Sequence, residues 1–150
     1  MRSELSRREA LVLGSAAGLV FAVTGAPATA KSLMDEAMSA FAGDAEIMEG
    51  KVEIDAPEIA ENGNSVPIEV MVDSAMEGDD MVQEILVLAD GNPRPGVATF
   101  RFSELSGEAR ASTRIRLAKS QNVVALAKMK DGSVYRADRA VKVTIGGCGG

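Results

Sequence analysis

The chain has 150 residues, which is enough for one domain, and a formal net charge of −6 from 22 acidic and 16 basic residues. This acidic balance argues against nucleic acid or an anionic membrane surface as a partner. The chain has no histidine and one cysteine, which excludes most metal sites built from nitrogen or sulfur ligands.

Residues 1–30 have the order of features found in an export signal. Arg7-Arg8 is an adjacent basic pair, and an apolar stretch of mainly small residues follows from Ala10 to about Ala26. Ala28-Thr29-Ala30 then offers a small-x-small cleavage site. Paired arginines before a mild apolar region predict a twin-arginine signal peptide that is removed during export to the bacterial periplasm. A retained membrane anchor is the alternative, but the apolar stretch is short for a membrane span.

The mature chain would begin at Lys31 and open with one short helix. Ser32 is a candidate N-cap, and acidic residues stand in the turn that follows. Gly43 is a helix-ending residue. We expect a helix of about ten residues that packs against one end of the domain, with docking on a partner as the alternative. The apolar residues at helical spacing are Leu33, Ala37, Met38 and Phe41.

Seven strand candidates follow, and none of the connections between them has a helical pattern. Turn signals separate them, including Asn62-Gly63-Asn64-Ser65 and the hairpin signal Asp131-Gly132. Many short strands with turn-rich connections predict an all-β fold. We therefore expect an immunoglobulin-like antiparallel β-sandwich over residues 31–145, with the short helix at its N-terminal end. The strand candidates are 51–55, 66–73, 82–89, 97–102, 109–117, 122–130 and 134–145.

Two of these strands lack the usual alternation of apolar and polar residues. Residues 85–88 and 123–127 are apolar throughout, so both faces of the sheet would carry apolar side chains. In a two-layer sandwich, the outer face of each sheet is expected to contact water. Either the helix or a second protein must therefore cover the extra face. Four methionines leave a similar choice between core filling and a subunit interface, namely Met71, Met76, Met81 and Met129.

Two charged groups in this domain are candidate binding sites. The turn 77–80, Glu-Gly-Asp-Asp, has carboxylates that suit calcium, but its spacing fits no EF-hand loop. Arg110, Arg114 and Arg116 lie on one side of a strand and form either an anion site or an ordinary solvated face. We favour the solvated interpretation for both groups. The sequence shows no Ser-His-Asp set, no Cys-His pair and no phosphate-binding loop, so we expect no catalytic residues.

The chain ends in Gly146-Gly147-Cys148-Gly149-Gly150, which contains its only cysteine. Glycines on both sides leave this backbone unusually free to change conformation. In an oxidising compartment, a lone cysteine has no intrachain disulfide partner. An unperturbed thiol is only slightly ionised near neutral pH, so it is a modest nucleophile alone. We therefore predict a flexible arm over residues 146–150 that presents the Cys148 thiol to other enzymes.

The signal, the β-rich domain and the terminal Gly-Gly-Cys-Gly-Gly together resemble the SoxY family, the sulfur-carrier subunits of the periplasmic thiosulfate-oxidising Sox system. The resemblance implies an immunoglobulin-like sandwich and a chain that is a covalent carrier rather than an enzyme. It also implies that sulfur intermediates are attached to Cys148, with no metal or cofactor bound. The swinging-arm glycines of the family correspond to Gly146, Gly147, Gly149 and Gly150.

The same resemblance implies a set of protein partners. A SoxZ-like subunit would bind the chain tightly. A SoxAX-like cytochrome complex would couple thiosulfate to the cysteine, and a SoxB-like dimanganese hydrolase would then release sulfate. A SoxCD-like molybdenum–haem dehydrogenase would oxidise the remaining sulfur. No nucleic acid partner is expected, and no membrane contact after processing.

Two other interpretations of the tail stay open on the sequence alone. A ubiquitin-like carrier would use the carboxylate of Gly149-Gly150, but its activation requires ATP, from which export would separate it. An exported β-sandwich interaction module would instead dimerise through a Cys148 disulfide. Replacement of Cys148 distinguishes the ubiquitin-like carrier from a sulfur carrier, because only the sulfur carrier requires the thiol.

Overall fold

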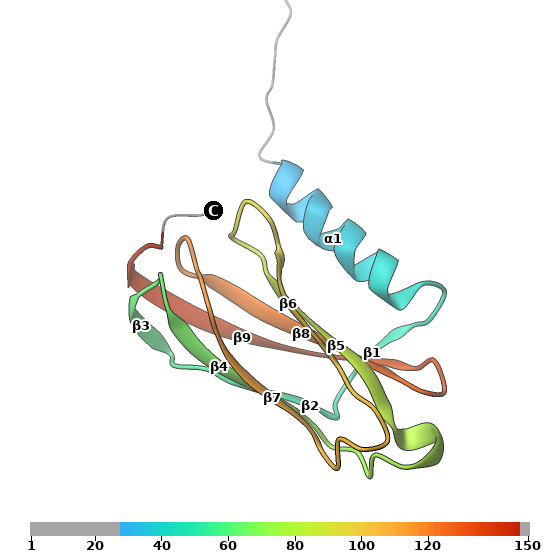
Figure 1. Ribbon diagram of the computed structural model, residues 1–150. Coiled ribbons are helices and arrows are strands. Elements are labelled where there is room, and N and C mark those ends of the chain that lie inside the picture. The colour runs from blue at the N-terminus through green and yellow to red at the C-terminus, as the bar shows by residue number, and fades with distance from the viewer. Residues whose placement is uncertain (1–27, 148–150) are drawn as a thin grey trace, which may run out of the picture.

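The computed structural model describes residues 28–147, which form two packed β-sheets with one helix against the larger sheet (Figure 1). The larger sheet has six strands: five in the order β1-β9-β8-β5-β6, and β3, which also pairs with β9. The smaller sheet has three strands in the order β2-β4-β7. The all-β sandwich with one short helix that the sequence predicts is therefore confirmed.

All seven strand candidates are present, and two of them, 82–89 and 134–145, have the predicted bounds. The helix is α1 (Ala28–Ala42), and a single 3-10 turn, η1, spans Gly78–Asp80. In the larger sheet the strands are β1 (Ile47–Glu49), β3 (Ile59–Asn62), β5 (Val82–Ala89), β6 (Gly96–Arg101), β8 (Gln121–Met129) and β9 (Val134–Ile145). In the smaller sheet they are β2 (Val52–Asp55), β4 (Val66–Val72) and β7 (Ala109–Ile115).

The antiparallel prediction is wrong for two short strands that the sequence pattern does not predict. Both β1 and β3 run parallel to β9, with Ile47 opposite Val134 and Ala60 opposite Val143. They contain only three and four residues, too few for a visible alternation. Each can pair because β9 has 12 residues, so its two halves accept different partners. The other pairings are antiparallel.

The helix α1 covers the second apolar face that β5 and β8 present. Met34 and Ala42 are buried against Leu88, Val124 and Leu126 of these strands. The packing role predicted for the helix is thus confirmed, and it explains why both strands are apolar on both sides. Its predicted length and place are wrong, because the helix has 15 residues and covers a face of the larger sheet rather than one end of the domain. No helix within residues 28–147 is long and apolar enough to cross a membrane.

The two ends of α1 differ in how well the sequence predicted them. Gly43 ends the helix as expected: its φ is +63°, and its N–H donates to the Ser39 carbonyl at 2.9 Å. The predicted N-cap is wrong, because Ser32 lies inside the helix, which begins at Ala28. The start lies three residues before the expected cleavage point at Lys31.

The main core lies between the two sheets and is almost entirely aliphatic. In β4, alternate residues face it: Val66, Ile68, Val70 and Val72 are buried. Three of the four methionines singled out in the sequence also fill this core, and the fourth, on the outer side of β4, is half-buried. The core methionines are Met76, Met81 and Met129.

Candidate functional site

The C-terminal end of β9 reaches one end of the sandwich, where three connections gather (Figure 1). They are the β3–β4 turn around Gly63, the β5–β6 turn, and the β7–β8 loop that contains Leu117. Strand β9 ends here and Gly146 and Gly147 follow it, so this end is the candidate functional region.

Three backbone hydrogen bonds link the end of β9, the start of the tail and two of these connections to one another. The Gly63 N–H donates to the Ile145 carbonyl at 2.8 Å, and the Leu117 N–H donates to the Gly63 carbonyl at 2.8 Å. The Gly147 N–H then donates to the Leu117 carbonyl at 2.9 Å. Gly63 and Gly147 are both buried. We call this group of residues, Gly63, Leu117, Ile145 and Gly147, the tail anchor.

Three glycines in or beside the tail anchor, Gly63, Gly146 and Gly147, lie too close to neighbouring backbone to carry a side chain. A Cβ on Gly147 would lie 2.8 Å from the Gly63 carbonyl oxygen, and one on Gly63 would lie 2.7 Å from the Gly147 nitrogen. A Cβ on Gly146 would collide with the carbonyl oxygen of Ala118. None of the three has a positive φ, so the backbone conformation does not require glycine. Glycine is needed at these positions because the backbones approach each other closely.

This geometry differs from the expectation that the backbone from Gly146 onward makes no fixed contacts. Gly147 is buried and hydrogen-bonded, and Gly146 lies against Ala118. Cys148, Gly149 and Gly150, the rest of the predicted arm, lie outside the described residues. Gly63 is a functional candidate that the sequence alone does not reveal, because Asn62–Ser65 has the pattern of an ordinary turn.

The arginines on β7 and just after it form a solvated face, as expected, but their partners differ. Arg110 donates to Glu69 at 2.9 Å. Arg114 approaches the Ser65 hydroxyl at 3.3 Å and pairs with no carboxylate within residues 28–147. Arg116 is exposed, and its carbonyl accepts a hydrogen bond from the Asn92 amide at 2.8 Å.

The acidic turn 77–80 binds a lysine of its own chain. Lys51 Nζ and Asp80 Oδ1 lie 2.5 Å apart, and the other Asp80 oxygen accepts the Ala75 N–H at 2.8 Å. The hydrogen bond from Lys51 holds the pKa of Asp80 below its usual value, and Asp80 raises the pKa of Lys51. Among the described residues, no group of three or more metal-binding side chains is found.

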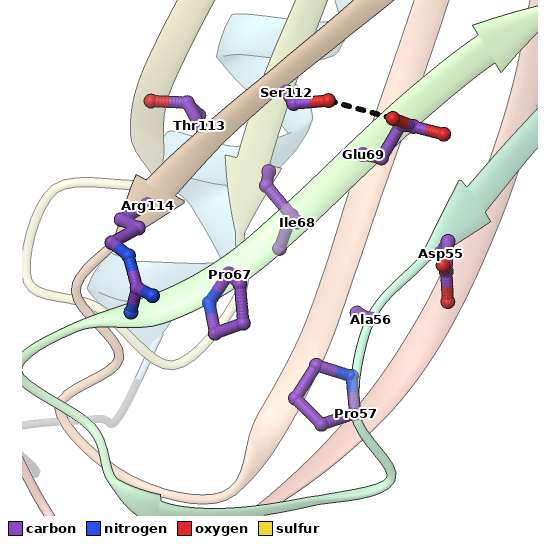
Figure 2. Close-up of a pocket in the computed structure, with 9 residues that line it drawn as sticks. All are labelled: Asp55, Ala56, Pro57, Pro67, Ile68, Glu69, Ser112, Thr113 and Arg114. Atoms are coloured by element: carbon purple, nitrogen blue, oxygen red, sulfur yellow. Dashed lines mark hydrogen bonds between the residues drawn. The ribbon is translucent and has the colours of Figure 1, made fainter.

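A hollow lies on the outer side of the smaller sheet, with a volume of about 450 Å³. Figure 2 shows its lining from β4, β7 and the end of β2, including Pro57, Pro67 and Arg114. Its central carboxylate, Glu69, is already bound by the Ser112 hydroxyl at 2.7 Å and by Arg110. The same carboxylate is therefore shared between the Ser112 hydroxyl and the Arg110 guanidinium, and its charge is balanced by the arginine.

Comparison with protein families gives one match. The family model described as "Sulfur oxidation protein SoxY" matches residues 38–148, which include the tail anchor and the cysteine. A search of curated proteins found no match.

Solved structures include a similar chain, the sulfur carrier protein SoxY from Chlorobium limicola f thiosulfatophilum. It is 36% identical, with a TM-score of 0.64, and the alignment covers 77% of this chain and 99% of that one. Superoxide reductases share only the fold. The protein from Nanoarchaeum equitans is 12% identical with a TM-score of 0.54, covering 64% of this chain and 100% of its own. A T24K variant from Ignicoccus hospitalis is 18% identical with a TM-score of 0.53, covering 64% and 82%.

Proposed function

The chain belongs to the SoxY family of sulfur oxidation proteins, and from this premise we propose that it carries sulfur covalently on Cys148 in the periplasm. A carrier role in sulfur oxidation follows from the family match and from the similarity to a solved sulfur carrier. The observation that supports the site is positional. Cys148 directly follows Gly147 in the sequence, and Gly147 is hydrogen-bonded at the loop end of the sandwich.

The proposed loading step joins thiosulfate to the thiol by oxidation. A bond forms between the Cys148 sulfur and the outer sulfur of thiosulfate, the thiol proton is released, and two electrons pass to a SoxAX-like cytochrome complex. Water then attacks the terminal sulfonate with the help of a SoxB-like hydrolase. Sulfate leaves with two protons, and the remaining sulfur stays on the cysteine as a persulfide.

The chain supplies the attachment point in this scheme, and the partners supply the catalysis. A thiol is a useful carrier because sulfur–sulfur bonds form and break by attack of thiolates and other nucleophiles on sulfur. The apolar residues of β5 and β8 are covered by α1. They therefore give no support to a subunit interface, and binding of a SoxZ-like subunit rests on family membership alone.

Intact-mass analysis of the chain purified from thiosulfate-grown cells, with and without a reductant, tests the proposal. We expect reductant-sensitive sulfur adducts on wild-type protein and none on Cys148→Ser. The variant should fold normally and fail to support thiosulfate oxidation in cells. Thiosulfate oxidation at the wild-type rate by Cys148→Ser would refute the carrier role. An active disulfide dimer with an inactive reduced monomer would instead indicate an interaction module.

A further inference from the structure

The arginines within residues 28–147 differ in whether they pair with a carboxylate. Four of them do so, at distances from 2.9 to 3.7 Å. Arg94, Arg114 and Arg116 have no carboxylate partner in that part of the chain, and all three line one pocket. Positive charge without a partner is thus gathered at one place in a chain whose net charge is −6. The paired arginines are Arg101, Arg110, Arg136 and Arg139.

The pocket lies between the edges of the two sheets. Strands β6 and β7 are the edge strands, and the pocket is lined by the β5–β6 turn, the start of β6 and the end of β7. Its volume is about 330 Å³, which is within the range of small-molecule sites, roughly 300–1,000 Å³. No aspartate or glutamate of residues 28–147 lines it. The pocket therefore has the size and the charge for a small anion.

Asn92 holds the two walls of the pocket together. Its side-chain amide donates to the Arg116 carbonyl at 2.8 Å, and its Oδ1 atom accepts the Ala118 N–H at 2.9 Å. The same Oδ1 accepts from the Gln121 amide at 2.9 Å, and the Gln121 Oε1 accepts the Gly91 N–H at 2.7 Å. The β5–β6 turn is thereby fixed against residues 116–121, so an anion would meet a backbone that is already in place.

Two of the three guanidinium groups are free to bind a ligand. Arg114 donates to the Ser65 hydroxyl at 3.3 Å and approaches the Ser65 carbonyl at 3.4 Å. Neither the Arg94 nor the Arg116 guanidinium has a partner within residues 28–147, and both residues are exposed. A small ion from solution can therefore reach both groups.

We propose that this pocket binds a small divalent oxyanion of the class of sulfate and thiosulfate, with Arg94 and Arg116 as the donors. Guanidinium groups present paired N–H donors that match the spacing of two oxyanion oxygens, and charge-assisted hydrogen bonds of this kind are stronger than neutral ones. A divalent anion also offsets the repulsion among three like charges around one pocket. The site consists of described residues alone, so it does not depend on whether Cys148 carries sulfur.

NMR of the arginine side-chain Nε–H groups tests this site in the full chain with Cys148→Ser, which removes the thiol from the experiment. Sodium sulfate or sodium thiosulfate is added while sodium chloride keeps the ionic strength constant. We expect saturable shifts of the Arg94 and Arg116 signals with either divalent anion, and unchanged Arg101 and Arg110 signals. The absence of saturable shifts at Arg94 and Arg116, or equal shifts when chloride alone is added, would overturn the inference.

Paired substitutions separate this site from a general effect of charge. In R94Q/R116Q, the dissociation constant for sulfate, followed by the backbone amide shifts of residues 92–97, should rise about fivefold, the effect of two exposed ion pairs. R101Q/R110Q is the matched control, because it removes the same charge from the opposite ends of β6 and β7. Its dissociation constant should equal that of the parent. Equal weakening in both double variants would overturn the inference.

Asn92→Ala distinguishes a formed pocket from three exposed charges. This variant keeps all three arginines and removes the hydrogen bonds that hold residues 116–118 to the turn. We expect weaker sulfate binding than in the parent, with no change of net charge. An unchanged dissociation constant in Asn92→Ala would show that the charges attract the anion without the pocket, which would also overturn the inference.

Discussion

Replacing Gly63 with alanine tests whether the tail anchor depends on the absence of a side chain. The new Cβ would lie 2.7 Å from the Gly147 nitrogen and 2.9 Å from Val143 Cγ1, and it would collide with the Leu117 carbonyl oxygen. Two of these three contacts are backbone atoms of neighbouring segments, which cannot rotate away as a flexible side chain would. The turn must therefore move away from both the β7–β8 loop and the tail.

The expected cost combines overpacking with weakened hydrogen bonds. Crowding in a well-packed region costs about 1–3 kcal/mol, and each backbone hydrogen bond contributes about 1 kcal/mol. Since Gly63 donates one of the three bonds of the anchor and accepts another, we expect Gly63→Ala to lower the free energy of unfolding by about 2–4 kcal/mol. Urea unfolding of the Cys148→Ser background measures this without interference from disulfides.

Gly96→Ala is a matched control, because a Cβ at that position meets no atom within 4 Å. Its free energy of unfolding should stay within about 0.5 kcal/mol of the parent protein. Amide hydrogen exchange gives a local measurement: the Gly147 N–H should exchange faster in Gly63→Ala and unchanged in Gly96→Ala. Equal stability of the two variants, with equal protection of Gly147, would show that the contact at Gly63 does not hold the tail.

Three further outcomes follow from the packing and the charges. Leu126→Ala leaves a cavity between the helix and the larger sheet and should lower the free energy of unfolding by about 2–5 kcal/mol. Leu105→Ala is the control, because this side chain is 96% exposed and its loss should change the free energy by less than about 0.5 kcal/mol. Equal losses in urea unfolding would contradict the packing of Leu126 against α1. Asp80→Asn should lower stability at neutral pH. Because the pKa of Asp80 is lowered in the folded state, the ion pair contributes fully to stability above the unfolded pKa of about 3.9, and this contribution is lost as the pH falls through the lower folded pKa. Because the pKa of Lys51 is raised, the contribution is full below the unfolded pKa of about 10.4 and is lost as the pH rises through the higher folded pKa. The stability difference between Asp80→Asn and the parent should therefore vanish at both pH extremes, and a difference that persists below pH about 2 would argue against the ion pair. Asn92→Ala removes the hydrogen bonds to Arg116 and Ala118 and should lower the free energy of unfolding by about 1–3 kcal/mol. The Ala118 amide should exchange faster with solvent. Unchanged exchange of this amide would mean that Asn92 does not hold residues 116–118 in place.

The sequence predicted those parts of the fold whose pattern repeats over many residues. Strand β4 shows alternate burial over seven residues, which a period of two makes visible. Strands β5 and β8 were found despite the lack of alternation, because they are long apolar runs between turn signals. Their apolar residues on both faces also predict that a further element covers the outer face of the sheet, and the structure identifies α1 as that element.

The parts that could not be predicted depend on partners distant in the sequence. Strands β1 and β3 exist because β9 offers them an edge, and no pattern within three or four residues reveals that pairing. Gly63 is adjacent in space to Gly147, although 83 residues lie between them. Only the folded chain shows that the glycine of an ordinary turn signal is also needed for close packing against the tail.

The four positions around the cysteine therefore require glycine for two different physical reasons. Gly146 and Gly147 allow backbones to approach closely at the tail anchor, whereas the swinging-arm role proposed for Gly149 and Gly150 requires conformational freedom. The sequence alone placed the base of the arm at Ile145, which gives three residues a reach of about 10 Å. With Gly147 hydrogen-bonded to Leu117, the free length before the thiol shrinks to about one residue, or 3.6 Å. An enzyme that reacts with Cys148 must then either bind the loop end of the sandwich closely or break the hydrogen bond at Gly147. A carrier whose Gly147 amide loses protection only when a partner enzyme is bound would show that the partner releases the arm.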